Sequence, residues 1–368
     1  MTATPEKPLA RVLTLWPLVF YGMGVIVGAG IYVALGAVIA RAGAFAPLSF
    51  LFAGLCAGLT GLCYAELAGR IPKASGAVAF VGAGFQSRAA GVIVGAATIV
   101  AVSVASAAIA HGAARFLSQI IPAPELVVSG GLVAAFTLLA MTGTRASVGF
   151  AAFIGVLEVG GLVAAFTVGL ATAPHIHPPA LVPANLAELQ GALAGAFIAF
   201  FAFIGFETLA NMSEDTKDAQ HTVPLAILGA VAASLVIYVS VSWAASLSGN
   251  GGVNPLVGLF EGRGATVFAA VGFLSVANGV LVEILMLSRL LYGMANNGQL
   301  PAALGHVDPV HRTPRRAAIA AGAIVLAATV ALPFEKLLVL SNAITLGIFL
   351  AVDLALLAMR SEEHTSEL

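Results

Sequence analysis

Long apolar segments recur along the chain and are separated by short polar stretches. A membrane-spanning helix needs about 20 mostly apolar residues. Ten segments approach or exceed that length, at residues 16–40, 45–69, 89–117, 125–141, 150–171, 191–213, 223–247, 265–292, 316–332 and 335–358. The pattern predicts an all-α integral membrane protein in which ten transmembrane helices are present.

The segments divide into two sets of five. We expect a cytosolic N-terminal segment (1–15), a first five-helix repeat (16–171), an outer loop (172–190), a second five-helix repeat (191–359) and a tail (360–368). Because five is an odd number, the second set must begin on the opposite side of the membrane from the first. The two sets can therefore form an inverted repeat, as in many secondary transporters.

Lysine and arginine residues set the predicted orientation. With the N-terminus in the cytosol, twelve fall on the inner side and four on the outer side. The inner set is Lys7, Arg11, Arg70, Lys73, Arg88, Arg145, Lys217, Arg289, Arg312, Arg315, Arg316 and Arg360, and the outer set is Arg41, Arg115, Arg263 and Lys336. Cytoplasmic loops carry such an excess, so we predict a multi-pass protein of the cytoplasmic membrane.

Composition supports the same class of protein. The sequence is 60% hydrophobic and 9% charged, and its mean hydropathy is +1.03. Soluble domains carry about 25% charged residues, so the composition excludes a soluble globular protein. The formal net charge of −1 gives no reason to expect a nucleic-acid partner. The expected partners are the lipid bilayer and a small molecule, and the oligomeric state is left open.

The tail, residues 360–368, has an unusual sequence. It matches the translation of the start of a widely used sequencing-library adapter. We therefore expect the tail to be non-native and the natural chain to continue beyond Met359. The alternative is a short charged cytosolic tail.

Two segments contain glycine where the helix would cross the middle of the membrane. The first is Val27–Ile31 and the second is Phe201–Glu207, and each lies in the first helix of its set. An unpaired backbone group in hydrocarbon costs several kcal/mol, so a broken helix survives only where it is buried in protein or lines a polar cavity. Paired interruptions at corresponding positions point to a transporter's substrate site. We therefore predict that helices 1 and 6 are discontinuous.

The predicted breaks suit both ends of an α-amino acid. Free amides at Ala29 and Gly30, at the positive end of a half-helix, would bind a carboxylate. Carbonyls released near Ile26 and Phe201 would bind an ammonium group. The predicted substrate-binding residues are Ile26, Val27, Gly28, Ala29, Gly30, Ile31, Phe201, Ala202, Phe203, Ile204 and Gly205. The alternative interpretation is that these glycines allow close helix packing.

The chain resembles the amino acid–polyamine–organocation (APC) superfamily of permeases. The motifs that carry the resemblance are Gly28-Ala29-Gly30-Ile31; Tyr64-Ala65-Glu66-Leu67 with Ile71-Pro72-Lys73-Ala74-Ser75-Gly76; Phe203-Ile204-Gly205-Phe206-Glu207 with Glu214, Lys217 and Pro224; and Ser288-Arg289 through Asn297-Gly298-Gln299-Leu300-Pro301 to Thr313-Pro314.

The resemblance implies a LeuT/APC-like core, a 5+5 inverted repeat with discontinuous helices 1 and 6. It also implies that the Phe201 ring is a gate over the substrate. Relatives of this kind usually have twelve helices, so the resemblance implies truncation after the tenth. Proton-coupled relatives often carry a lysine in helix 5 where this chain has Glu158, so that lysine's role cannot be transferred.

Three acids lie well inside apolar segments, namely Glu158, Glu207 and Glu283. A carboxylate at mid-membrane costs roughly 2.5 to 3.5 kcal/mol on insertion scales, so such residues usually face a cavity or a partner. Burial favours the neutral form of a carboxyl group. We predict these three as proton-coupling candidates, with Glu158 first and Glu207 second, and H⁺ as the coupling ion. The alternative for each is a structural hydrogen bond.

The predicted function is secondary active transport of an amino acid by alternating access, as proton symport or exchange. A polyamine or organic-amine transporter of the same fold and a non-transporting amino-acid receptor are the alternatives. An enzyme is not predicted, because the histidines form no nucleophile–base or metal set. His175 and His177 are interpreted as loop residues, so no metal or other cofactor is predicted, and no nucleotide-binding loop is present.

Overall fold

The computed structural model describes residues 13–71, 76–141, 144–248, 254–308 and 313–366. Within these ranges the chain forms helices and loops, and its β-pairing is a single parallel bridge between Leu13 and Thr216. The α-helices are α1 (Leu15–Ala42), α2 (Ala46–Arg70), α3 (Gly76–Gly84), α4 (Arg88–Leu117), α5 (Glu125–Ala140), α6 (Thr144–Thr172), α7 (Leu186–Ala199), α8 (Ala219–Leu247), α9 (Gly262–Asn296), α10 (Arg315–Ala331) and α11 (Phe334–Ser366). The 3₁₀ helices are η1 (Gly43–Phe45), η2 (Phe200–Phe203), η3 (Phe206–Asp215), η4 (Val257–Leu259) and η5 (Ala302–Gly305). The predicted all-α class is confirmed.

Seven helical stretches of the described chain are long and apolar enough to cross a membrane. The first, Leu15–Arg70, contains both α1 and α2. The helices α5 and α10 have 16 and 17 residues, which at 1.5 Å per residue falls short of a hydrocarbon core of about 30 Å. A multi-pass membrane protein is therefore established, whereas ten crossings remain a prediction.

The long helices are apolar around their whole circumference. Large side chains such as Leu59 (67% exposed) and Val156 (74% exposed) point away from the bundle. A helix that is hydrophobic on all sides belongs in a protein core or in a membrane. These outward faces therefore fit contact with lipid chains.

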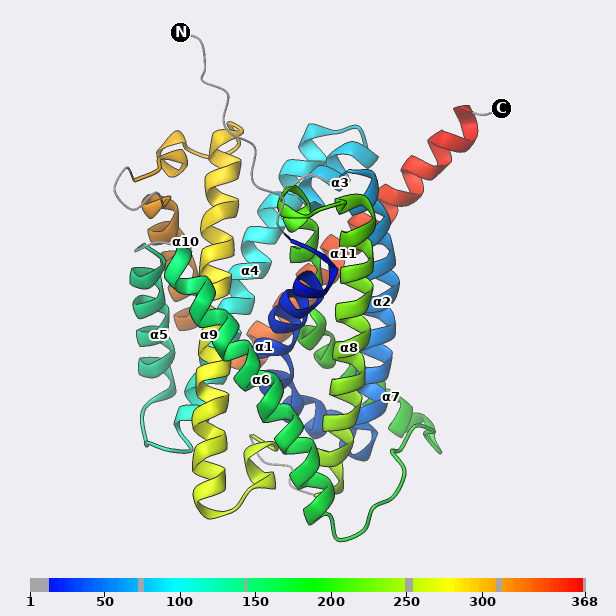
Figure 1. Cartoon of the computed structure of the whole chain (residues 1–368), viewed down its shortest axis with the longest axis vertical. Helices are drawn as coiled ribbons and strands as arrows, with labels where there is room; N and C mark the ends of the chain where they lie inside the picture. The colour runs from blue at the N-terminus through cyan, green and yellow to red at the C-terminus, as the bar shows by residue number, and fades with distance from the viewer. Residues whose placement is uncertain (1–12, 72–75, 142–143, 249–253, 309–312, 367–368) are drawn as a thin grey trace.

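Four of the five pairs of helices that hold the same position in the two predicted sets pack against one another. The contacts join α1 with α7, α2 with α8, α4 with α9, and α5 with α10. Buried residues of α1, α2, α4, α8 and α9 contribute to one continuous hydrophobic core. Figure 1 shows α1 running through the middle of the bundle, with long helices such as α2, α8 and α9 around it.

The basic residues of the described chain divide between the two ends of the bundle. In α4, Arg88 is the first residue and Arg115 lies near the last, and in α9 Arg263 lies in the first turn and Arg289 about two turns before the end. Each helix therefore carries its predicted inner cation at one end and its predicted outer cation at the other. Lys7, Arg11, Lys73 and Arg312 lie outside the described residues, as does the 72–75 part of the motif after α2.

One helix was not predicted. The nine residues of α3 follow α2 and pack on α4 and α11. They lie in a stretch that the sequence pattern left as an inner loop, because nine apolar residues are too few to suggest a transmembrane helix.

Candidate functional site

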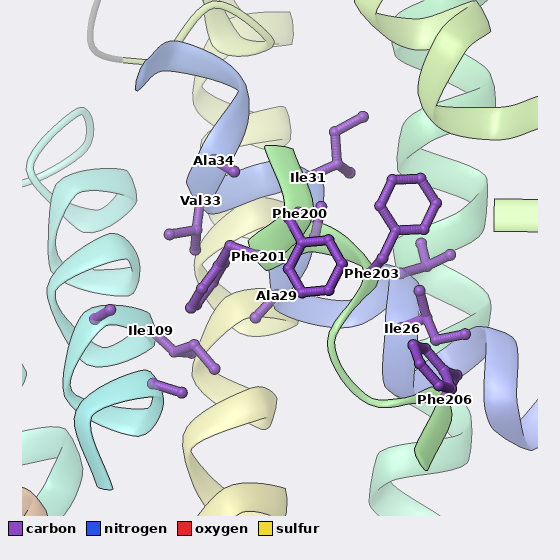
Figure 2. Close-up of a cluster of buried hydrophobic side chains, with 14 of the residues drawn as sticks. Ile26, Ala29, Ile31, Val33, Ala34, Ile109, Phe200, Phe201, Phe203 and Phe206 are labelled. Carbon is purple, nitrogen blue, oxygen red and sulfur yellow. The ribbon is translucent and has the colours of Figure 1, made fainter. Parts of the chain in front are cut away.

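The helix that begins at α7 is interrupted at residues 204–205. After η2, Ile204 adopts an extended conformation (φ −60°, ψ 136°) and Gly205 has φ +125°. A side chain strongly disfavours that φ, so glycine is required at this point. Figure 2 shows the non-helical turn between Phe203 and Phe206. The predicted interruption of helix 6 is confirmed.

Side chains of the broken helix itself and of α11 satisfy backbone groups around this break. Asn342 of α11, which is fully buried, donates from Nδ2 to the carbonyl of Phe197 at 2.6 Å. Glu207 accepts a hydrogen bond from the Gly205 amide at 2.8 Å, and Thr208 donates to the Gly205 carbonyl at 2.6 Å. The break is therefore a fixed feature whose polar groups are paired by nearby side chains.

The predicted break in helix 1 is wrong. The helix α1 runs without interruption from Leu15 to Ala42, so the amides of Ala29 and Gly30 lie inside a helix. A Cβ atom added to Gly30 would lie 2.6 Å from both the Cα and the carbonyl oxygen of Ala202. The glycine therefore lets α1 approach the backbone of η2, which is the close-packing alternative. A helix tolerates an internal glycine at a cost of about 1 kcal/mol relative to alanine.

A tyrosine hydroxyl joins α1 to the broken helix. The side chain of Tyr238 is fully buried on α8, and its hydroxyl lies 2.7 Å from the Ile26 carbonyl oxygen and 2.8 Å from the Ala202 carbonyl oxygen. The hydroxyl has one proton to share between these two acceptors. The predicted carbonyl at Ile26 is therefore already close to a donor within the protein.

We expect Tyr238→Phe to destabilise the fold by about 1–3 kcal/mol, because two buried carbonyls would lose their shared donor. The ring would keep its contacts with Phe50 and Phe203. The midpoint of thermal unfolding in detergent measures the effect, with Tyr292→Phe, at a half-buried tyrosine of α9, as the control. An unfolding midpoint equal to that of the control would show that the Tyr238 hydroxyl does not stabilise the fold through these two carbonyls.

A cavity of about 1460 Å³ enters the bundle and reaches the break. Its walls come from α1, α2, α3, α4, α6, α9, α11, η3 and the Ile204–Gly205 turn. On α9 they run from Asn278, near the middle of the helix, to Asn297 just past its end, and on α1 from Pro17 to Val25. The cavity therefore extends from mid-bundle to the end at which α1 begins and α9 ends.

The predicted substrate residues divide into two groups around this cavity. Ile204 and Gly205 line it, whereas Ile26–Ile31 and Phe201–Phe203 are buried and lie outside its walls. Phe201 is 4% exposed, and Figure 2 shows its ring between Val33 of α1 and Ile109 of α4. Its role as a gate remains a prediction.

The three predicted acids lie in two places. Glu207 and Glu283 line the cavity. Glu158 is 1% exposed and lies against α1, with its Oε2 3.4 Å from the position of a Cβ at Gly28. Glu158 Oε1 and Glu283 Oε2 have no hydrogen-bond partner among the described residues. Glu158 therefore lies where α6 meets α1, and its proton-coupling role remains a prediction.

Sequence reasoning missed three polar residues of this region, Tyr238, Asn278 and Asn342. Each is an uncharged polar side chain in an apolar helix, and such residues are less conspicuous in the sequence than charged ones. A polar amide at mid-helix in an otherwise apolar segment is itself a signal of function or of a buried hydrogen bond. Among the described residues, no cluster of three or more histidine, cysteine or acidic side chains is arranged to hold a metal ion.

Comparison with known proteins gives one family and a set of relatives. A family model described as "Amino acid permease" matches residues 13–359. The methylthioribose transporter of Bacillus subtilis (strain 168) is 25% identical over 390 residues, which covers 97% of this chain and 83% of that protein. The branched-chain amino acid permease BcaP of the same organism is 25% identical over 388 residues, with coverage of 97% and 83%.

A plant relative is longer. The vacuolar cationic amino acid transporter 4 of Arabidopsis thaliana is 27% identical over 395 residues, which covers 96% of this chain and 64% of that protein. The chain therefore spans less than two thirds of the length of that relative.

Proposed function

The chain belongs to the amino acid permease family, and from this premise we propose that it carries an amino acid across the cytoplasmic membrane by alternating access. One observation carries the proposal. A cavity enters from one end of the bundle and stops at a helix break that closely adjoins α1. A substrate bound there would reach the opposite side of the membrane if the bundle opened beyond the break and closed at the present mouth of the cavity.

We propose the 5+5 inverted repeat with ten crossings as the architecture behind this motion. The packing of four of the five corresponding pairs supports it, since helices that lie near an axis relating two repeats pack against their counterparts. The first repeat would be residues 16–171 and the second 191–359. Short helices such as α5 would cross where the bilayer thins around them.

The open end of the cavity is proposed to face the cytosol. The predicted inner cation Arg289 lines the cavity near its mouth, and α1 begins at the same end. Positive residues favour the cytosolic side. The conformation described here would then be inward-facing, with the buried Phe201 part of the closed outer half.

For binding, we propose that the substrate's ammonium group meets acceptors at the break, near Ile204 and Gly205 of the cavity wall. The first amides of η3 are less suited to the substrate carboxylate, because the Glu207 carboxyl group already accepts from Gly205 and from its own amide. Glu158, Glu207 and Glu283 remain the proposed proton-coupling groups, with H⁺ as the ion.

Uptake of labelled amino acids into proteoliposomes tests the proposal. We expect accumulation of at least one amino acid, and more of it when the outside is acidic than when no pH gradient is applied. Binding without uptake would favour the receptor alternative. The absence of both binding and uptake, for every amino acid, polyamine and methylthioribose tested, would contradict the proposed function.

A further inference from the structure

Two hydrogen-bond acceptors on the inner wall of the cavity lack a donor. Asn278 of α9 lines the cavity, is 7% exposed, and has no hydrogen-bond partner for its Oδ1 among the described residues. Glu283 lines the same wall, and its Oε2 also has no partner within the described chain. A buried acceptor without a donor costs about 1–3 kcal/mol. A ligand that brings donors would remove this cost.

Charge points to the same kind of ligand. Glu207 and Glu283 both line the cavity. The Glu158 carboxyl group, which interacts with the Asn278 side chain, is a third acid near this wall. Among the described residues, the basic side chain that lines the cavity is Arg289. Arg289 follows Glu283 by six residues in α9, which corresponds to about 9 Å along the helix axis, so it lies toward the mouth and leaves the inner acids without a cation.

The hydrogen bonds at the break also favour a ligand that brings donors. The Gly205 amide donates to Glu207, and the hydroxyl of Thr208 donates to the Gly205 carbonyl. Donors at the break are therefore used within the protein. Ammonium and guanidinium groups have only donors, and a guanidinium group has five of them in a planar fork that fits carboxylates.

We propose that the cavity selects amino acids with a positively charged side chain, whose ammonium or guanidinium group binds between Glu283, Glu207 and Asn278. This inference rests on the proposed function and specifies its substrate class. The α-ammonium group stays at the Ile204–Gly205 break, and the side chain extends along α9 toward Glu283.

Arginine and citrulline provide the sharpest test, because they have nearly the same shape and differ in side-chain charge. Binding is measured on purified wild-type protein by thermal shift and by competition with labelled arginine in proteoliposomes. We expect arginine to bind at least about tenfold more tightly than citrulline, and lysine to bind more tightly than leucine. Equal affinity for arginine and citrulline would overturn the inference.

Glu283→Gln tests the named site. We expect it to lower arginine affinity about tenfold or more and to leave citrulline affinity within about twofold, whereas Glu261→Gln, at an exposed acid outside the cavity, should change neither. Unchanged arginine affinity in Glu283→Gln would overturn the site. Cadaverine binding as tightly as lysine would support the ammonium site and show that the carboxylate adds little.

Different results would refute the substrate class and the proposed function. Transport of leucine with no preference for arginine over citrulline would refute this inference and leave the proposed function standing. Failure of every amino acid to bind or to cross would refute the proposed function itself.

Discussion

Gly30→Ala is expected to reduce amino acid uptake at least about tenfold. The added Cβ atom would lie 2.6 Å from backbone atoms of Ala202. No side-chain rotation relieves a clash with backbone, so α1 and η2 must move apart. Overpacking of this kind usually costs about 1–3 kcal/mol. The movement would also weaken the Tyr238 bridge that joins the two elements.

A glycine with open space around it supplies the control. A Cβ atom at Gly58 of α2 meets nothing within 4 Å, so Gly58→Ala should keep normal uptake and gain slightly in helix stability. Uptake and the midpoint of thermal unfolding are measured for both variants. If Gly30→Ala behaves like Gly58→Ala in both measurements, the close approach of α1 to the break is unimportant for transport.

Glu158→Gln is expected to abolish uptake driven by a pH gradient. The carboxyl group is buried beside Gly28, and Oε1 has no partner in the described structure. A proton taken up there would neutralise a charge at the interface between α1 and α6 in each transport cycle. Glutamine has the same shape and is permanently neutral. Substrate exchange without a gradient should therefore persist within about twofold, while accumulation falls at least about tenfold.

The same two assays on Glu207→Gln and Glu283→Gln separate the three candidate acids. Loss of gradient-driven uptake in one of them, with Glu158→Gln unaffected, would move proton coupling to the cavity wall. Glu207→Gln needs an unfolding measurement beside it, because Glu207 also accepts the Gly205 amide. Full gradient-driven uptake by Glu158→Gln would show that Glu158 is not the proton-coupling group.

The two glycine-containing segments show how far sequence alone reaches. Each contains glycine at mid-helix, and the same pattern permits either a break or a close approach. Gly205 has a positive φ and lies at a break in its helix. Gly30 lies inside a continuous helix, and its missing side chain lets that helix pack against the backbone of Ala202. That choice depends on a partner far away in the sequence, so no local pattern could make it. All ten predicted apolar segments nevertheless coincide with helices of the structure.

The acids were easier to predict than their partners. An ionisable residue in an apolar segment is conspicuous, and Glu158, Glu207 and Glu283 all lie at the cavity or beside α1. Neutral donors such as Tyr238 and Asn342 are common in membrane helices, and only the fold shows that their hydrogens point at the carbonyls around the break.

Substrate protection of a single cysteine tests the central claim, that the amino acid binds where the cavity meets the break. Ile204→Cys is placed in a protein in which Cys56 and Cys63 are replaced by serine, and its labelling rate with N-ethylmaleimide is measured. We predict that a transported amino acid at saturating concentration slows labelling about fivefold or more, while a control cysteine at the exposed Gln119 is unaffected. An unchanged rate at position 204 would contradict the account.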